Sequence, residues 1–348
     1  MYIDCVGLFG TKNMFGFENK DWKTWTMFDG TEVLVPELFN IEPDKNGNVP
    51  MYAEGDRSFP PAAVMPEGGF YFDSTERQKP IDDDKLNVED NLEEFGPFSE
   101  KELTHLEKQS GWLYNNTDYA IVYSMGGTSF GDIAFVPGPG LKDPKGIRGV
   151  EEWYVSTILR REYIREVFDR ECEIALKNLA RVKEAVGDRI EVIFISGTDF
   201  GTQRGPFISP DAYHDLYKPF HKKICDWIHN NTQWKVFIHS CGGIRPLIED
   251  IIEAGFDILN PVQCSAEGMD ACDLKRDFGD RVTFWGGGID TQKTLPFGTP
   301  EDAYDEVRER IGIFNKNGGF VFDAIHNIQA GSPVENVLAM LDAIKDSF

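Results

Sequence analysis

The sequence predicts an α/β protein, a (β/α)8 (TIM) barrel with an irregular, β-leaning N-terminal elaboration. Two observations lead to this class. From residue 118 onward, six short apolar runs alternate with amphipathic helical patterns, and strands that alternate with helices imply parallel pairing through right-handed crossovers. The length of 348 residues also suits a barrel, because this fold reaches that size as one unit.

The six runs are almost continuously apolar, which is typical of strands buried on both faces. They lie at residues 118–125, 190–196, 234–239, 256–263, 281–285 and 319–325. A run at Met1–Leu8 and the elaboration are expected to supply the remaining strands, and a strand so close to the start suggests a truncated or late-started chain. We place residues 1–115 in the barrel start and elaboration and residues 116–348 in the main barrel, within one structural domain.

Helical patterns fill the intervals between the runs. They begin near Glu100, cover Val150–Val186 with a break near Arg160–Arg161, and start again at Ser209–Pro210, Ile244 and Pro333. Serine at an N-cap followed by proline at the first helical position is a favoured helix start.

The N-terminal third is rich in aromatic residues. Alternating aromatic positions on both sides of Asp29–Gly30 predict a β-hairpin, and the polar, acidic segment Asp82–Glu94 predicts a solvated loop. The candidates for lining a pocket in this third are Arg57, Arg77, Trp22 and Trp25. Surface packing is the usual role of such side chains, so the pocket is one of two alternatives.

Composition restricts the partners and the location of the protein. A net charge of −24 argues against nucleic acid, which selects basic surfaces. No run has the length of a membrane-spanning helix or the layout of a secretion signal. Six cysteines are scattered without the dense spacing of a disulfide framework. We therefore expect a cytoplasmic protein whose cysteines are reduced thiols or metal ligands.

The stretch Trp234–Gly243 carries the clearest chemistry. An apolar strand ends in His239, Ser240 and Cys241, followed by two glycines. Residues i and i+2 of a strand point to the same side, so the imidazole and the thiol are expected to face each other. Both groups are preferred zinc ligands, and zinc takes four ligands, or three with an open position in a catalytic site.

Two later runs end in further candidate ligands, Cys264 and His326. The C-terminal ends of parallel barrel strands form the active-site face. We therefore expect His239, Cys241, Cys264 and His326 to meet there as metal ligands. Packing is the alternative for each, because free cysteine is among the most buried residue types.

Several of these segments resemble the uroporphyrinogen decarboxylase superfamily. The loop Gly197–Gln203 followed by Ile208–Pro210 looks like a signature of the superfamily. Three further segments are similar to its zinc-dependent methyltransferase branch: His239–Gly242, Gly298–Glu301 and Gly331–Asn336. This branch includes methylcobalamin:coenzyme M methyltransferases, and its metal site is similar to that of cobalamin-independent methionine synthase.

The metal motif of that branch is His-x-Cys followed by a distant Cys, with an acidic ligand between them in some members. His239 and Cys241 match the motif directly. Cys264 falls at the acidic position and His326 at the distant Cys, so both depart from the pattern while offering legitimate zinc ligands. These departures leave the ligand set open.

The resemblance implies a zinc-dependent methyltransferase that moves a methyl group between a corrinoid (cobalamin) carrier protein and a small substrate. Zinc would favour the thiolate of a thiol acceptor, or make the leaving oxygen of a methyl ether less basic. The aromatic N-terminal third favours a methoxylated aromatic donor. The candidate catalytic residues are Asp199, Asp290 and Gln292. For the last two, turn formation near glycine is the alternative.

Three aromatic residues near the predicted site, Phe200, Trp285 and Tyr123, are candidates for an apolar wall around a flat substrate, with core packing as the alternative. Other functions also remain open. A metal-independent decarboxylase on the same barrel would leave His239 and Cys241 without a role, and the acidic N-terminal third suits a polycarboxylate substrate poorly. A barrel that only docks a corrinoid protein would show no turnover. Zinc-bound water would make a hydrolase, although cysteine ligands suit methyl chemistry better.

Overall fold

The computed structural model describes residues 5–347, which form two compact units. The first unit contains the chain up to Gly7, Trp112–Ser129 and everything from Gly187 onward. The second contains Leu8–Gly111 and Phe130–Val186. The second unit thus takes residues from both sides of position 115, where the sequence suggests a single division.

A seven-stranded sheet forms the centre of the first unit. In spatial order its strands are β1 (Cys5–Leu8), β7 (Ala120–Ser124), β8 (Val192–Ser196), β11 (Lys235–His239), β12 (Ile258–Asn260), β13 (Thr283–Trp285) and β14 (Phe320–Val321). Each pairing from β7 to β14 is parallel. All six predicted runs are strands, which confirms the (β/α)8 type of barrel sheet. The expected first strand is described from Cys5, and its residues 1–4 lie outside the described part.

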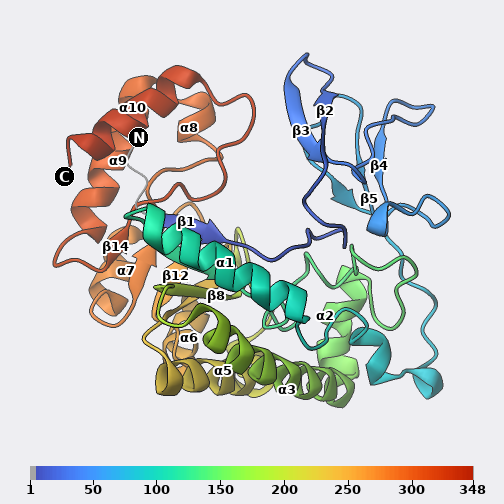
Figure 1. Cartoon of the computed structure of the whole chain (residues 1–348). Helices are drawn as coiled ribbons and strands as arrows, with labels where there is room; N and C mark the ends of the chain where they lie inside the picture. The colour runs from blue at the N-terminus through green and yellow to red at the C-terminus, as the bar shows by residue number, and fades with distance from the viewer. Residues whose placement is uncertain (1–4, 348) are drawn as a thin grey trace. The chain divides into compact units, whose positions relative to one another are not determined.

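Helices follow the strands of this unit in the alternation that the sequence predicts. They are α4 (Pro210–Ala212), the π-helical turn η4 (Tyr213–Tyr217), α5 (Lys218–Asn231), the 3₁₀ turn η5 (Arg245–Leu247), α6 (Ile248–Ala254), α7 (Ala271–Phe278), α8 (Thr294–Phe297), α9 (Pro300–Phe314) and α10 (Val334–Lys345). A short hairpin, β9 (Gly201–Thr202) and β10 (Gly205–Pro206), precedes them. The predicted cap is present, since Ser209 Oγ accepts a hydrogen bond from the Ala212 N–H. Helices α9 and α10 pack side by side (Figure 1).

The two faces of the barrel sheet bury different residues. On one face Val192, Phe237 and Ile258 form a layer of buried side chains. The alternate positions Ile193 and Ile238 are fully buried on the other face. His239 and Asn260 each follow the Val192–Phe237–Ile258 layer by two residues, so they continue its face at the C-terminal ends of β11 and β12.

The second unit combines small antiparallel sheets with long helices. Its strands are β2 (Trp22–Thr26), β3 (Glu32–Pro36), β4 (Val49–Met51), β5 (Ala63–Met65) and β6 (Asp73–Ser74); its helices are η1 (Ala53–Gly55), η2 (Asp83–Lys85), η3 (Val88–Asn91), α2 (Val150–Leu159) and α3 (Arg161–Val186), and α1 (Glu100–Asn116) crosses the unit boundary. Figure 1 shows β2 and β3 as the hairpin predicted around Asp29–Gly30, with Trp22 opposite Pro36. The break between α2 and α3 at Arg160 is also as predicted. Within residues 5–347 the elaboration adds no strand to the barrel sheet.

The prediction of a solvated loop at Asp82–Glu94 holds for most of its residues, which are exposed, but not for the whole segment. This segment contains η2 and η3, and its residues Asn91 and Leu92 are buried. Asn91 Nδ2 donates to Ile147 O at 2.8 Å, and Asn91 Oδ1 accepts from Ile147 N at 2.9 Å. The acidic composition hid this role, because the segment folds against residues more than fifty positions away.

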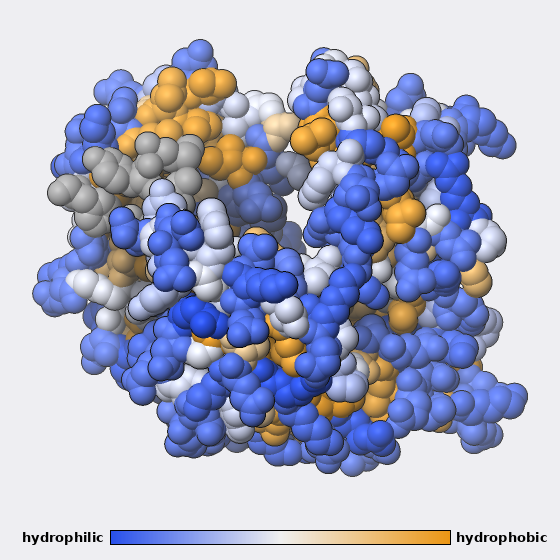
Figure 2. Space-filling model, in the orientation of Figure 1, coloured by the Kyte–Doolittle hydropathy of each residue, from blue (hydrophilic) through white to orange (hydrophobic). Residues whose placement is uncertain are grey.

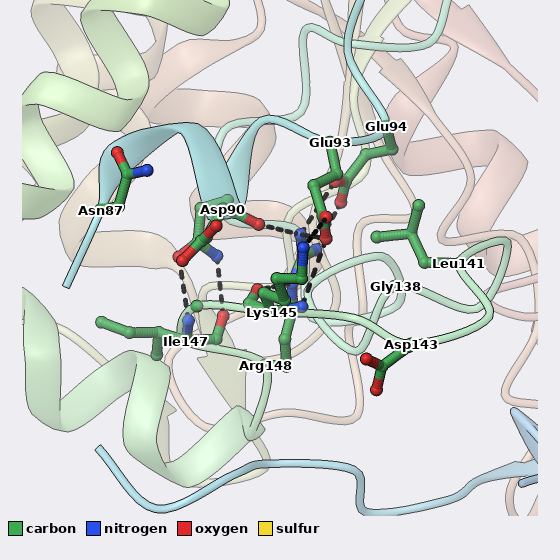
Figure 3. Close-up of polar contacts among 12 residues, drawn as sticks. Asn87, Asp90, Glu93, Glu94, Gly138, Leu141, Asp143, Lys145, Ile147 and Arg148 are labelled. Carbon is green, nitrogen blue, oxygen red and sulfur yellow. Dashed lines mark hydrogen bonds and ion pairs between the residues drawn. The ribbon is translucent and has the colours of Figure 1, made fainter. Parts of the chain in front are cut away.

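Arg148 forms the centre of the same contact region (Figure 3). Its side chain is 2% exposed, and its two terminal nitrogens reach Glu94 Oε1 and Oε2 at 2.6 and 3.0 Å. The remaining bonds go to backbone carbonyls of Lys145, Asp90 and Val136. The guanidinium has five N–H groups, so five acceptors satisfy it. We call this set, Arg148 with Glu94 and the three carbonyls, the Arg148 cluster.

Three of the four side chains predicted as candidates for lining a pocket make contacts within the second unit. Arg77 donates to the carbonyls of Pro137, Gly138 and Leu141. Arg57 binds Glu42 and Asn40, and Trp25 packs on Phe39 at 5.6 Å between ring centroids. Trp22 is 55% exposed.

The visible surface is mostly hydrophilic, with apolar groups over the α10 region (Figure 2). Three side chains there are largely exposed: Phe297 of α8 and Val334 and Leu338 of α10. Among the described residues, no helix combines the length and the apolar character that crossing a membrane requires.

Candidate metal centre

Three side chains of the first unit converge just beyond the ends of two adjacent strands. His239 Nε2 lies 3.3 Å from Cys241 Sγ and 3.7 Å from Asp199 Oδ1. Asp199 Oδ1 also accepts a hydrogen bond of 2.7 Å from the Cys241 backbone N–H. All three residues are partly buried, and their ligand atoms lie within 4.8 Å of one another. The His239 and Cys241 side chains share one side of β11, as the strand alternation predicts.

The position of Asp199 depends on the register between β8 and β11. Phe237 pairs with Phe194, but the next residue, Ile238, pairs with Ser196, so β8 carries one extra residue. Cys241 and Asp199 are each three residues beyond the Ile238–Ser196 pair. Without the irregularity, Asp199 would be shifted by one residue relative to Cys241. The bulge therefore aligns Asp199 with His239 and Cys241.

Asn260 fixes which nitrogen of His239 faces the cluster. The sheet register places Asn260 directly opposite His239. Asn260 Nδ2 donates to Trp285 O at 2.9 Å, so its Oδ1 is left to face His239 Nδ1 at 2.5 Å. An amide oxygen only accepts, which places the imidazole proton on Nδ1. The Nε2 lone pair is then directed toward Cys241 and Asp199, the arrangement that a metal-binding histidine requires.

Two glycines allow the loops of the site to touch through their backbones. A Cβ on Gly201 would lie 2.5 Å from Cys241 O, and a Cβ on Gly242, whose φ is +86°, would lie 2.4 Å from the carbonyl carbon of Gly201. Any side chain at either position would force the loops apart. Close approach of two chain segments is therefore what requires glycine at both positions.

The Cys241 thiol is strongly held in its protonated form when no metal is bound. Burial raises its pKa to about 12, and the charge of Asp199 and a hydrogen bond to it act in the same direction. Thiol ligands bind zinc as thiolates, so metal binding displaces this proton. A cation at the cluster would reverse the repulsion between thiolate and carboxylate.

The other predicted ligands lie outside the convergent group. Cys264 is half-buried, and burial raises its pKa to about 12, with the Arg310 charge acting against the shift and the Glu306 charge adding to it. His326 is exposed, and its Nδ1 lies 3.4 Å from Asn327 O. Among the described residues, the group of potential ligands contains Asp199, His239 and Cys241 but neither Cys264 nor His326.

Asp290 and Gln292 are held in a turn. Asp290 Oδ1 accepts hydrogen bonds from the backbone N–H groups of Gln292 and Lys293 at 2.7 and 3.1 Å. Gln292 is exposed and accepts a 3.4 Å bond from Gln203. This is the turn chemistry weighed as the alternative for both residues. Of the three candidate catalytic residues, the structure places Asp199 in the cluster.

Sequence reasoning missed two further polar residues beside the cluster. Asn260 ends β12 next to His239, and the signal available was its position at the C-terminal end of the adjacent parallel strand. Asp323 follows β14 and lies close to the His239 ring and the Trp285 side chain. Surrounding protein atoms raise the Asp323 pKa although the residue remains open to solvent. Asp323 could also have been found from the sequence, because it lies near the C-terminal end of a predicted parallel strand.

The spacing of the cluster fits a tetrahedral zinc ion. With metal–ligand bonds of about 2.0–2.3 Å, tetrahedral geometry separates neighbouring ligand atoms by roughly 3.3–3.6 Å. The separations of 3.3 and 3.7 Å around His239 Nε2 are close to this range. His239, Cys241 and Asp199 would hold the ion through one nitrogen, one sulfur and one oxygen, three protein ligands as in catalytic zinc sites.

The fold and the site together indicate a barrel protein with a candidate metal site, formed by His, Cys and Asp side chains at the C-terminal ends of the parallel strands. This chain belongs to the uroporphyrinogen decarboxylase (URO-D) family, whose model matches residues 148–347, more than half of the chain. The resemblance to that superfamily drawn from the sequence is confirmed.

The proteins to which this chain is similar include methyltransferases. A methylated-thiol–coenzyme M methyltransferase from Methanosarcina mazei is 24% identical over 140 residues, 40% of this chain. The match covers only 34% of that relative's length. A solved structure of a methyltransferase from Methanosarcina mazei superposes with a TM-score of 0.55 and 19% identity over 82% of this chain and 74% of that chain. At this identity the superposition supports the fold.

Proposed function

We propose that the protein is a zinc-dependent methyltransferase that moves a methyl group between a small substrate and the corrinoid of a carrier protein. The observation that carries the proposal is the convergence of Asp199 Oδ1, His239 Nε2 and Cys241 Sγ at one edge of the barrel sheet. Further support comes from the family and from the methyltransferase relatives. In this proposal a methylated compound bound at the metal would be the methyl donor, and a free thiol bound there would be the acceptor.

Each residue of the cluster has a distinct task in this proposal. His239 offers Nε2 because Asn260 holds the proton on Nδ1. Cys241 would bind the metal as a thiolate after losing its proton, and Asp199 would supply an oxygen ligand. The zinc ion, when bound, would lower the pKa of a substrate thiol or polarise an ether oxygen. Cys264 and His326 as additional ligands, and Asp290 and Gln292 as catalytic residues, stay predictions.

A sulfur substrate is favoured over a methoxylated aromatic one. Two of the aromatic residues offered as a wall for a flat substrate, Phe200 and Tyr123, are 0% and 2% exposed and belong to the core. Trp285 packs on Phe237 with ring centroids 5.4 Å apart. The aromatic argument from the sequence therefore loses its support near the cluster, while the Methanosarcina mazei relative is named for a methylated thiol.

The corrinoid carrier is the expected protein partner. It is proposed from the resemblance to the corrinoid-linked branch of the family. Exposed apolar surface on α8 and α10, at Phe297, Val334 and Leu338, is compatible with a protein partner, because such patches mark interaction sites.

The first test is the metal content of protein purified without chelator, measured by elemental analysis for the natural chain and for His239→Ala. We expect about one zinc per natural chain and a large loss in the variant. Methyl transfer to reduced cobalamin is then measured with a methylated thiol and with a methoxylated benzoate, and transfer from methylcobalamin is measured with the corresponding thiol and phenol. Absence of zinc from a well-folded sample would refute the proposal and favour the metal-independent decarboxylase, for which Asp199 is the residue to test. Zinc without transfer from or to either substrate class would refute the methyltransferase assignment alone.

A further inference from the structure

Ser240 lies between the two ligands His239 and Cys241, but its side chain serves a different loop. Strand alternation directs it away from the cluster, and it is 1% exposed. Its Oγ accepts a hydrogen bond of 2.9 Å from the backbone N–H of Phe200, the residue that follows Asp199. Its own backbone N–H donates to Asn260 O at 2.8 Å. Ser240 therefore connects the Asp199 loop with the strand that carries the other two ligands.

The Phe200 side chain is fixed from its other side. Its ring contacts Tyr213 at 5.2 Å, Tyr217 at 5.0 Å and His221 at 6.4 Å between ring centroids, each nearly perpendicular to it. The π-helical turn η4 carries both tyrosines, and π-helical turns occur often at functional sites. Tyr213 OH is 3.0 Å from His221 Nδ1, and all four side chains are buried. The Phe200 backbone is thus held at its ring and at its N–H.

Two neighbouring contacts reinforce the same connection. Gly243 N donates to Thr202 O at 2.8 Å, and the Asp199 carboxylate accepts from Cys241 N. The backbones of Gly201 and Gly242 meet without room for a side chain. Fixing Phe200 N fixes the backbone torsion that orients Asp199, because the two residues share a peptide bond.

We infer that Ser240 is a positioning residue for the metal centre: through Phe200 it holds Asp199 beside His239 and Cys241. This inference rests on the proposed metal site and adds to it a residue that touches no ligand atom of the cluster with its side chain. Loss of the hydroxyl frees the Asp199 loop while His239 and Cys241 stay on β11. The bond from Asp199 to a metal ion should therefore weaken, while those from His239 and Cys241 should not.

The experiment is a double-mutant cycle read by Co²⁺ binding to the full chain. Affinity is measured by competition with a chelator, and the thiolate and ligand-field absorption bands report coordination. We expect Ser240→Ala to lower Co²⁺ affinity roughly tenfold and to alter the ligand-field bands. In the Asp199→Ala background, Ser240→Ala should change affinity by less than about twofold, because coupled residues are not additive. Ser240→Thr keeps a hydroxyl and should recover most of the affinity.

The control is Ser156→Ala, which removes another fully buried serine hydroxyl, one that accepts from Arg160, in the second unit. It should leave Co²⁺ affinity unchanged. Equal losses for Ser240→Ala with and without Asp199 would assign the serine a general structural role and overturn the inference. Should Ser240→Ala not fold, Ser240→Gly, which also removes the hydroxyl, replaces it in the cycle with the same two outcomes. If the natural chain itself binds no Co²⁺, the proposed metal site fails; if it binds and Ser240→Ala binds equally, only the positioning role fails.

Discussion

Two polar clusters of this protein differ in how their groups are satisfied. In the Arg148 cluster, five donors meet five acceptors, and the charge of Arg148 is paired with Glu94. At the candidate metal centre, nitrogen, sulfur and oxygen ligand atoms converge, and burial together with the Asp199 charge raises the pKa of the Cys241 thiol to about 12. A satisfied buried cluster holds chain segments together. A cluster of convergent acceptors is suited to bind a cation.

In the sequence, the candidate metal site was easy to recognise and the Arg148 cluster was not. Glu94 lay in a segment expected to be solvated, and no pattern marked Arg148. His239 and Cys241 were evident from spacing alone. Two metal-binding residue types at short spacing indicate a binding site in the sequence. A structural cluster between residues 54 positions apart leaves no local sequence pattern. The following changes test the difference between the two clusters, from the largest expected effect to the smallest.

Cys241→Ala should abolish both zinc retention and methyl transfer, because it removes the only sulfur ligand of the convergent group in the described chain. Elemental analysis and the transfer assay measure the two losses. Cys272→Ala is the matched control: Cys272 is an exposed free cysteine on α7 and should retain both properties. An active, metal-free Cys241→Ala protein would sink the zinc-centred mechanism.

Arg148→Met should lower the free energy of unfolding by about 3–5 kcal/mol, the usual range when one partner of a buried ion pair is removed. Urea denaturation measures the loss. Zinc content per folded chain should not change, because the Arg148 cluster lies in the second unit. Arg57→Met is the control, since the Arg57–Glu42 pair is largely exposed and such pairs contribute little. Equal stability of the two variants would contradict the structural role of Arg148.

Glu171→Gln tests a carboxyl kept neutral near the Arg148 cluster. Glu171 of α3 is 3% exposed, and burial, with the charges of Glu94 and Asp132, raises its pKa well above 4.5. Above pH 4.5 the unfolded chain loses this proton while the folded chain keeps it, so natural stability falls as pH rises. The variant lacks this dependence.

From pH 5 to 7, the free energy of unfolding of the natural chain should therefore fall relative to that of Glu171→Gln by up to about 1.4 kcal/mol per pH unit. Denaturation midpoints at several pH values measure it. A constant difference across this range would mean that Glu171 is ionised in the folded protein.

Asn260→Ala should lower zinc affinity roughly 10- to 100-fold, the usual cost of losing a partner that orients a metal-binding histidine. Chelator competition measures the change. Asn336→Ala is the control: Asn336 is also buried and donates to two carbonyls, Leu295 O and Gly298 O, in the α8–α10 region. It should cost stability without changing affinity. Equal affinities of both variants would show that His239 is oriented without Asn260.

The sequence by itself determined the barrel class, the order of its strands and helices, and the His239–Cys241 pair. These depend on local patterns: apolar runs, helix starts such as Ser209–Pro210, and the two-residue period of a strand. The hairpin around Asp29–Gly30 and the break at Arg160 followed from the same local rules.

Only the tertiary structure decided that Asp199 is the third member of the cluster and which residues hold the cluster in place. Asp199 reaches His239 because β8 carries one extra residue against β11, and no local pattern specifies such a bulge. Asn260 becomes the partner of His239 through sheet register, and Ser240 reaches Phe200 across two loops. Cys264 and His326 had suitable chemistry at strand ends, yet their side chains lie apart from the group. Residue type and spacing identify candidate ligands, but long-range pairing decides which of their atoms meet.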